Sequence, residues 1–327
     1  MKFELNDSIF LGTPVQTELI GLFDLGAVLQ HRVILLNQER EGAALAWLGQ
    51  QSSELQHELN RVLDDSSVLE TRYPSSVIWT VAADESAPNR VTVRQALFLM
   101  REPLRIHVEN SINDRAFLLS IMRRENQEYL RECERERCLE FVHGGGADLH
   151  THVTSLPVSK LENVKRLALF DSDALLPATP SAGSSRLLAA CTERHINAMR
   201  LERRAAENYL TKSQLYGWVS RPRHDRRRRR LLDAFFNCMN DTQRAHFRMR
   251  TGWGDDRRNE DYISMQNDID AFYSSAEAKQ DWALLEHGFG AAIRKLFGDV
   301  APKERELESS GVTAEFAPFF ATILSRL

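Results

Sequence analysis

The central part of this chain alternates short apolar segments with segments whose apolar side chains recur every three or four positions. The first kind has the length and composition of buried strands, and the second has the spacing of amphipathic helices. The expected strands are at residues 104–108 (LRIHV), 139–143 (LEFVH), 166–170 (RLALF) and 197–201 (NAMRL). The expected helices are at residues 115–124, along the stretch before residue 160, and at residues 185–196. Strands that alternate with helices predict a parallel sheet covered by helices on both faces.

The segments on either side of this central part have patterns of their own. The first hundred residues predict a separate α/β region, and the residues after 207 are mostly helical in pattern. The expected elements of the first region are a strand at 2–5, an apolar segment at 31–36, a helix at 42–63, and strands at 76–81 and 90–100. The expected later helices are at 231–240, 262–288, 290–298 and 316–327. We therefore predict an α/β protein with an N-terminal α/β region (1–103), a central domain built on a parallel sheet (104–220) and a C-terminal helical region (221–327).

The composition is that of a folded protein, since 43% of the 327 residues are hydrophobic and 27% are charged. The sequence has neither a leader-like apolar segment at its start nor a run of about 18 apolar residues, so we expect no membrane association. Its four cysteines form no CxxC pair, which favours reduced thiols and a cytoplasmic location.

The formal net charge is −4, so the average surface does not attract a polyanion and any nucleic-acid site has to be local. A local basic segment exists, because five consecutive arginines occupy residues 226–230. Such a run is either a solvated surface or a contact for phosphates, and lysine and arginine supply most non-specific affinity for nucleic acids. We favour phosphate contact. The candidate nucleic-acid-binding residues are Arg226, Arg227, Arg229, Arg230 and Arg248.

Acidic residues directly follow two of the expected strands. Glu109 comes after residues 104–108, and Asp171 comes after residues 166–170. Ligands of open parallel sheets bind beyond the carboxyl ends of the strands, so both acids are expected at one edge of the sheet. Asp173 lies two positions further on, and residues i and i+2 of an extended backbone project to the same side.

This set of carboxylates has two interpretations. An acid after a strand often only caps the next helix. Magnesium, however, prefers oxygen ligands and commonly takes one or two carboxylates together with water and a substrate phosphate. Because a strand ending in Glu and a strand ending in Asp-x-Asp belong to the same expected sheet, we favour a Mg²⁺ site, with Mn²⁺ as a substitute. Its ligands would be Glu109, Asp171 and Asp173.

Four segments carry a resemblance to a known family. Residues 107–118 (HVENSINDRAFL) resemble the opening motif of the TOPRIM fold, and residues 168–173 (ALFDSD) resemble its Asp-x-Asp strand. Residues 201–215 (LERRAAENYLTKSQL) resemble the R-x-x-E-N-Y-L segment of a group of prokaryotic TOPRIM proteins, and residues 246–256 (HFRMRTGWGDD) resemble its f-x-m-K-x-G segment. That OLD-like group includes the TOPRIM nuclease subunit of PARIS-type phage-defence systems.

The resemblance implies a function and a partner. The function is a metal-dependent endonuclease that cleaves DNA or RNA, with transfer RNA as one candidate substrate. The partner is an ABC-like or OLD-like ATPase, since this sequence has no GxxxxGK[ST] phosphate-binding loop of its own. Unrestrained cleavage would harm the host, so the resemblance implies an antiphage effector that its partner restrains until infection. The N-terminal region and the C-terminal helices are candidate docking surfaces, and a homodimer is compatible with this arrangement.

The resemblance also assigns roles outside the three carboxylates. Glu207 would be a further ligand or a supporting acid oriented by Asn208, although it is equally a helix-starting acid beside Tyr209. Arg250 stands where relatives have Lys and would balance charge on the phosphate. The implied catalytic set is Glu109, Asp171, Asp173, Glu207 and Arg250.

Two positions depart from the family pattern. Asn110 stands where the family has Gly after its Glu, and Asn tolerates left-handed backbone better than most residues. The spacing to the family's next acidic position is one residue longer here, so either Asn113 or Asp114 fills it.

Other functions of the same fold are less well supported. A primase would need zinc-ribbon spacing, and a topoisomerase would need a tyrosine in a recognisable strand-passage domain. A non-catalytic TOPRIM-fold subunit that docks onto an ATPase is disfavoured by the intact Glu and Asp-x-Asp motifs. A plain nucleic-acid-binding module would need the basic segment but not the carboxylates.

Overall fold

The computed structural model describes residues 1–11, 16–28, 32–35, 42–72, 78–84, 87, 89–145, 147–219, 226–257 and 260–327. These residues form two compact units. The first contains residues 1–104, 133–140 and 320–327, and the second contains residues 105–132 and 141–319. All the candidate site residues belong to the second unit.

The first unit contains a four-stranded parallel sheet in the order β2-β1-β3-β4. Its strands are β1 (Lys2–Leu5), β2 (Arg32–Leu35), β3 (Ile78–Val81) and β4 (Arg90–Val91). Its helices are η1 (Asp7–Ile9), α1 (Gln16–Val28), α2 (Gly42–Gly49), α3 (Ser53–Arg72) and α4 (Val93–Arg101). The predicted α/β character is confirmed, while residues 31, 36, 76 and 77 of the predicted segments lie outside the described residues.

Two predictions for this unit are wrong. Residues 90–100 form only the two-residue β4 before α4 begins, because Thr92 and Gln95 make a reciprocal cap. The Gln95 N–H donates to the Thr92 hydroxyl (3.3 Å), and the Thr92 N–H donates to the Gln95 side chain (2.8 Å). The single helix expected at 42–63 is instead two helices, since Ser52 accepts from the Leu55 N–H and starts α3.

The second unit is built on a parallel sheet in the order β6-β5-β7-β8. Its strands are β5 (Leu104–Val108), β6 (Leu139–His143), β7 (Arg166–Phe170) and β8 (Asn197–Arg200). All four strands predicted for the central part of the chain are confirmed, and so is the parallel sheet with helices around it. The central strand β7 is buried at four of its five positions, as a continuous apolar run requires when both faces of a sheet are covered.

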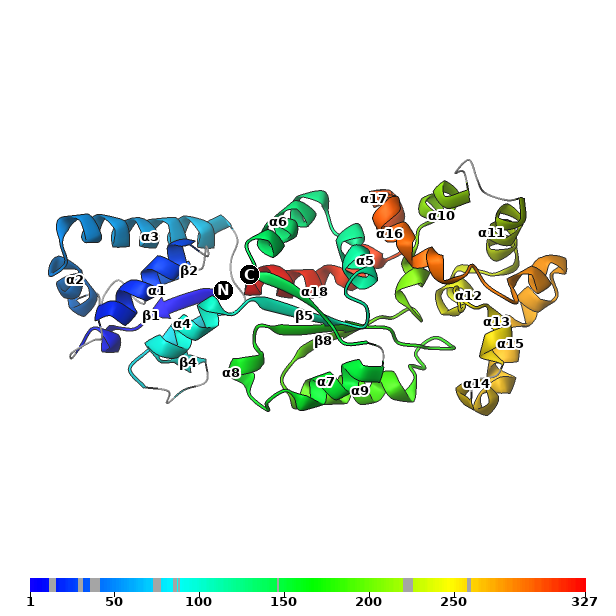
Figure 1. Cartoon of the computed structure of the whole chain (residues 1–327), viewed down its shortest axis with the longest axis horizontal. Helices are drawn as coiled ribbons and strands as arrows, with labels where there is room; N and C mark the ends of the chain where they lie inside the picture. The colour runs from blue at the N-terminus through cyan, green and yellow to red at the C-terminus, as the bar shows by residue number, and fades with distance from the viewer. Residues whose placement is uncertain are drawn as a thin grey trace. The chain divides into compact units, whose positions relative to one another are not determined.

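Helices lie on both sides of this sheet (Figure 1). On one side, α7 (Ala147–Ser155) and α9 (Ala182–Glu193) pack against β7. The core on this side contains Leu149, Val153, Ala168, Phe170, Leu187, Ala190, Cys191 and Ile196. The remaining helices of this part of the chain are α6 (Arg124–Arg135) and α8 (Lys160–Asn163).

An aromatic cluster packs around α5 (Asn113–Ile121), on the other side of the sheet (Figure 1). The ring of Phe117 lies 5.3 Å from that of Tyr209, 5.0 Å from that of Phe297 and 5.6 Å from that of Phe316, between centroids. These partners come from η3 (Ala206–Tyr209), α16 (Leu296–Asp299) and α18 (Val312–Arg326). The C-terminal region is therefore part of the core beside the sheet.

The chain after β8 is helical, as predicted, but in shorter pieces than the sequence pattern suggests. The expected helix at 262–288, for example, is divided into α14 (Glu260–Ser264), α15 (Gln266–Glu277) and η4 (Gln280–Leu285). The elements not yet named are α10 (Lys212–Val219), α11 (Arg226–Cys238), α12 (Asp241–His246), α13 (Trp253–Asp256), η5 (Ala291–Lys295) and α17 (Glu304–Ser309). Within the described part of the chain, no helix combines the length and the apolar character needed to span a bilayer.

Gly252 allows two backbone segments of the second unit to touch. Its φ is 75°, and an added Cβ would lie 2.3 Å from the carbonyl oxygens of both Leu285 and Glu286. G252A is therefore expected to lower the free energy of unfolding, measured in urea, by about 3 kcal/mol or more.

Gly298 provides the matched control, because an added Cβ there meets nothing within 4 Å. Since Ala is favoured over Gly inside a helix, G298A is expected to be neutral or to stabilise the protein by up to about 1 kcal/mol. Equal stability of the two variants would contradict the close backbone packing at Gly252.

Candidate functional site

The site lies where β5 and β7 end, side by side. These two strands are direct neighbours, and Val108 pairs with Leu169 near their carboxyl ends. Glu109 follows β5 immediately and Asp171 follows β7 immediately, so the two carboxylates emerge at the same edge. In the order β6-β5-β7-β8 the chain leaves these central strands in opposite directions, and the crevice beyond such a pair is where open α/β sheets bind ligands.

Asp171 is buried and both of its carboxylate oxygens accept hydrogen bonds. Oδ1 accepts from the Ala206 N–H (2.9 Å), and Oδ2 accepts from Nη2 of Arg294 (3.0 Å). Burial raises the pKa of Asp171 well above its usual range; the nearby Glu109 adds to this, whereas Arg294 opposes it.

Asp173 departs from the geometry that the sequence predicts. Its φ is 51°, in the left-handed region, so residues 171–173 are not extended and the period-two argument fails here. The turn is held by hydrogen bonds to the segment after β8: the Asp173 N–H donates to the Arg204 carbonyl (2.9 Å), and the Ser172 hydroxyl donates to the Arg203 carbonyl (2.8 Å). Asp173 is exposed, and it still lies near Glu109, whose charge it affects.

Glu109 is half-buried between like charges. Burial, together with the nearby carboxylates of Asp173 and Asp114, raises the pKa of Glu109 to about 7, although Arg294 and a hydrogen bond from the Asp171 N–H act to lower it. At neutral pH this carboxyl therefore exchanges readily between its protonated and ionised forms.

The turn after Glu109 is closed by side chains rather than by left-handed backbone. Asn110 has no positive φ; its side-chain oxygen accepts from the N–H groups of Ile112 (3.2 Å) and Asn113 (2.9 Å). Its own N–H donates to Oδ2 of Asp114 (2.7 Å). Asp114 is buried and its charge acts on Glu109 and Asp171, so of the two alternatives at this position it is the one that joins the cluster.

Glu207 belongs to the same cluster and shares a cation with Asp171. It is 3% exposed, and its Oε2 accepts from Nε of Arg294 (2.7 Å). Burial lowers the pKa of Arg294, but Glu207 and Asp171 outweigh this effect and raise it above its ordinary value. Glu207 also lies in the first turn of η3, beside Tyr209, so the structure is compatible with both interpretations of this residue.

Arg294 was not predicted from the sequence. It stands in the apolar segment GAAIRKLFG, whose pattern indicates only a helix. A charged residue beside Ile293 and Leu296, both buried, is a weak signal that its side chain finds a partner inside the protein. The partner itself cannot be read from the sequence, because Asp171 lies 123 positions away.

A second ion pair joins the two segments that carry the R-x-x-E-N-Y-L and f-x-m-K-x-G resemblances. Arg204 donates to both oxygens of Asp256, at 2.6 Å each, and both side chains are buried. Arg248, a candidate nucleic-acid contact, approaches Asp256 (3.3 Å) and Asp255 (3.0 Å) and is half-buried. Arg204 and Arg248 both act on the charge of Asp173. These two arginines therefore form the basic side of the site.

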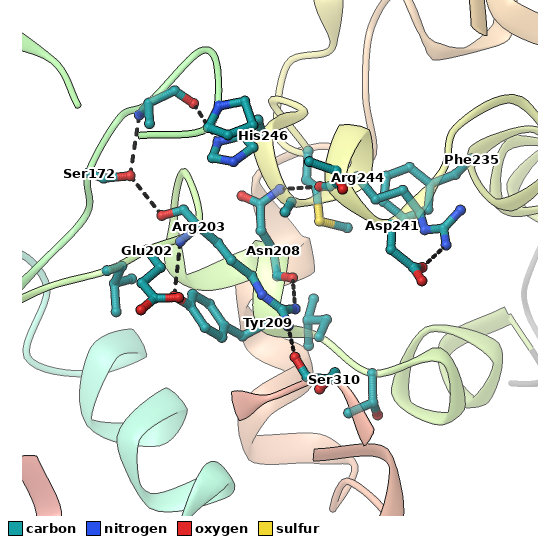
Figure 2. A pocket seen from close by; sticks show the side chains of 18 of the residues that line it. Ser172, Glu202, Arg203, Asn208, Tyr209, Phe235, Asp241, Arg244, His246 and Ser310 are labelled. Atoms are coloured by element: carbon teal, nitrogen blue, oxygen red, sulfur yellow. Dashed lines mark hydrogen bonds and ion pairs between the residues drawn. The ribbon is translucent and has the colours of Figure 1, made fainter. Parts of the chain in front are cut away.

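The side chain of Asn208 bonds to neighbouring backbone groups rather than orienting Glu207. Its side-chain oxygen accepts from the Ala205 N–H (3.2 Å), and its side-chain nitrogen donates to the carbonyls of Arg244 and Phe247 (2.8 Å each). Figure 2 shows Asn208 and Ser172 on the wall of a pocket of about 1000 Å³. None of the five clustered carboxylates, Glu109, Asp114, Asp171, Asp173 and Glu207, lines this pocket.

The predicted basic residues other than Arg248 are exposed. Arg226, Arg227, Arg229 and Arg230 are exposed at the start of α11, whereas Arg228 lies over the ring of Trp218, 4.8 Å from its centroid. Arg250 is exposed, and among the described residues its guanidinium has no hydrogen bond or ion pair. The cations that act on the charge of Asp173 are Arg204, Arg248 and Arg294, of which only Arg248 was predicted from the sequence.

The carboxylate cluster fits a divalent metal in its chemistry, although its arrangement is not that of a closed metal site. In the part of the chain that the structure describes, no three His, Cys, Asp or Glu side chains are positioned to hold one metal ion. Magnesium needs only one or two carboxylates when water and phosphate complete its shell. Glu109, Asp171 and Asp173 supply such oxygens, and their mutual repulsion calls for a cation; the guanidinium of Arg294 provides it here.

The pKa of Glu109 predicts how stability depends on pH without metal. Between pH 4.5 and about 7 the folded protein binds more protons at Glu109 than the unfolded chain does, so stability falls as pH rises. E109Q removes this loss. In EDTA, its stability relative to wild type is expected to rise over this interval, by at most about 3 kcal/mol, and then to level off. Urea unfolding at several pH values measures it.

Glu193, exposed on α9, is the control for this experiment. The difference between E193Q and wild type is expected to stay nearly constant with pH. A constant difference for E109Q as well would mean that Glu109 has an ordinary pKa.

Asn208 is expected to hold the loops of the site together. N208A leaves the Arg244 and Phe247 carbonyls without a donor, so it should lower the free energy of unfolding by roughly 2 to 4 kcal/mol. N237A, at an exposed position of α11, should change it by less than about 0.5 kcal/mol. Calorimetric or urea unfolding that ranks the two variants equally would argue against this supporting role.

Comparison of the chain with protein-family models, with curated proteins and with solved structures found no match.

Proposed function

We propose that this chain is a magnesium-dependent nuclease of the TOPRIM type. The observation that carries the proposal is the meeting of Glu109, Asp171 and Asp173 at the ends of two neighbouring parallel strands. Buried Glu207 and Asp114 add to the same cluster. A group of carboxylates that repel one another is costly to maintain, and cation binding is a function that would compensate for the cost.

Each residue of the site would have a distinct task. Glu109, Asp171 and Asp173 would hold one or two Mg²⁺ or Mn²⁺ ions. Such an ion, when bound, would polarise the scissile phosphate and lower the pKa of an attacking water. Arg248, half-buried on the Asp173 side, would contact the non-bridging oxygens of the phosphate and balance their charge. Arg250 is exposed. It would balance charge on the phosphate, as predicted, only if substrate binding brought its guanidinium to the carboxylates.

Nucleic acid is the proposed substrate, as DNA or as RNA such as transfer RNA. The exposed arginines at the start of α11 supply positive charge within a chain of net charge −4, which supports a local contact for the phosphate backbone. The carboxylates act on the phosphodiester group that DNA and RNA share, so they do not select between the two.

The resemblance to defence nucleases extends the proposal to regulation. We propose that a partner ATPase in the cytoplasm restrains this nuclease, which becomes toxic to an infected cell when it is released. The parallel α/β unit at the start of the chain is one candidate docking surface, because it lies outside the unit that carries the carboxylates.

Loss of either strand-end carboxylate is expected to abolish cleavage. Wild type, E109Q and D171N would be expressed in cells with and without a candidate ATPase, and both nucleic-acid pools would be sequenced for new ends. The substitutions keep the size of each side chain and remove its charge, so new ends should decrease about 100-fold or more. E193Q, which removes an exposed carboxylate of α9, should cleave like wild type.

Two outcomes would contradict the proposal. Cleavage that survives in folded E109Q and D171N would place the active site elsewhere. Nucleic-acid binding in EDTA, with no cleavage after Mg²⁺ is added in any condition, would identify a binding module instead.

A further inference from the structure

Arg294 uses the same carboxylate that a metal would need. Its Nη2 donates to Oδ2 of Asp171 (3.0 Å), while the other oxygen of Asp171 already accepts from the Ala206 N–H (2.9 Å). Asp171 therefore has no oxygen free of a hydrogen bond. The side chain of Arg294 is only 13% exposed and that of Asp171 is 11% exposed, so their contact is shielded from water.

The segment that carries Arg294 is fixed to the loop at residues 249–250. The Phe289 N–H donates to the Met249 carbonyl (2.7 Å), and the Gly290 N–H donates to the Arg250 carbonyl (2.9 Å). Ile293 is fully buried beside it. The backbone of η5 is therefore anchored, and any movement of the guanidinium has to come from rotation of its side chain.

Glu207 gives that side chain a second anchor. Its bond to Nε of Arg294 (2.7 Å) is shorter than the bond from Nη2 to Asp171, and Glu207 is the less exposed carboxylate. If the contact with Asp171 is lost, the guanidinium can stay paired with Glu207. The two contacts can thus be made or lost separately, without unfolding of η5.

We propose that Arg294 is the resting counter-ion of the site and that it competes with a divalent cation for Asp171. In the metal-free protein the guanidinium neutralises Asp171 and Glu207 together. Metal binding exchanges the Asp171 contact for a metal–oxygen contact and leaves Arg294 on Glu207. This inference rests on the proposed metal site and adds that the C-terminal segment of the chain controls its affinity.

Direct metal binding, without nucleic acid, tests the inference. Mn²⁺ would be titrated into wild type, R294Q and K295Q, and free Mn²⁺ measured by electron paramagnetic resonance. Because R294Q removes the competitor, its Kd for Mn²⁺ should fall about tenfold or more, the usual size of coupling between groups in contact. Lys295 is the adjacent residue and is exposed, so K295Q removes the same charge and should change Kd less than about twofold.

A second pair of variants guards against misfolding, because R294Q leaves buried Glu207 without a partner. E207Q and E207Q/R294Q differ only in the competitor and carry no unpaired Glu207. The double variant should bind Mn²⁺ about tenfold more tightly than E207Q does. Circular dichroism confirms that each variant is folded before titration.

The outcomes separate this inference from the proposed function. Suppose that wild type binds Mn²⁺, but that R294Q binds it no more tightly than wild type and the double variant no more tightly than E207Q. That result would overturn the competition and leave the metal site standing. An equal gain in affinity for K295Q would also overturn it, since long-range charge would then be the cause. No Mn²⁺ uptake by any folded variant would overturn both proposals.

Discussion

The need to balance buried negative charge organises the second unit of this protein. Carboxylates that lie close together inside a protein are costly unless a cation pairs with them. Here Asp171 and Glu207 are buried on different segments, and Arg294 pairs with both. Because Arg294 comes from the C-terminal region, this pairing ties the sheet, the segment after β8 and the C-terminal helices into one structure. Glu109, Asp114 and Asp173 add negative charge to the same cluster.

The fold brings these groups together by parallel pairing of β5 and β7. That pairing places Glu109 beside Asp171, although the two lie far apart in the sequence. The segment after β8 then returns to the same edge, where the Arg204 carbonyl accepts from the Asp173 N–H. The site therefore depends on how three segments lie relative to one another, namely the ends of β5 and β7 and the segment after β8. Its geometry is therefore as precise as the packing of the sheet with its helices.

Buried and hydrogen-bonded groups hold the backbone on which the carboxylates stand. The Arg204–Asp256 pair and the hydrogen bonds of Asn208 fix the backbone on which the acids stand, and these groups are buried. Asp173 keeps a left-handed backbone conformation, which non-glycine residues adopt at some energetic cost and which is common at functional sites. Under the proposed function, such a fixed backbone would let a metal ion and a phosphate bind with the rearrangement of side chains alone.

The sequence by itself determined the strands of the second unit, their alternation with helices in a parallel sheet, and the position of Glu109 and Asp171 at strand ends. These features follow from local patterns of apolar residues. It did not determine the left-handed turn at Asp173, which depends on hydrogen bonds to residues 203 and 204, nor the choice of Asp114 over Asn113. Above all it did not identify Arg294, whose partners lie 87 and 123 positions away. Local periodicity carries no information about such distant pairs, because they form only after the C-terminal helices pack against the sheet.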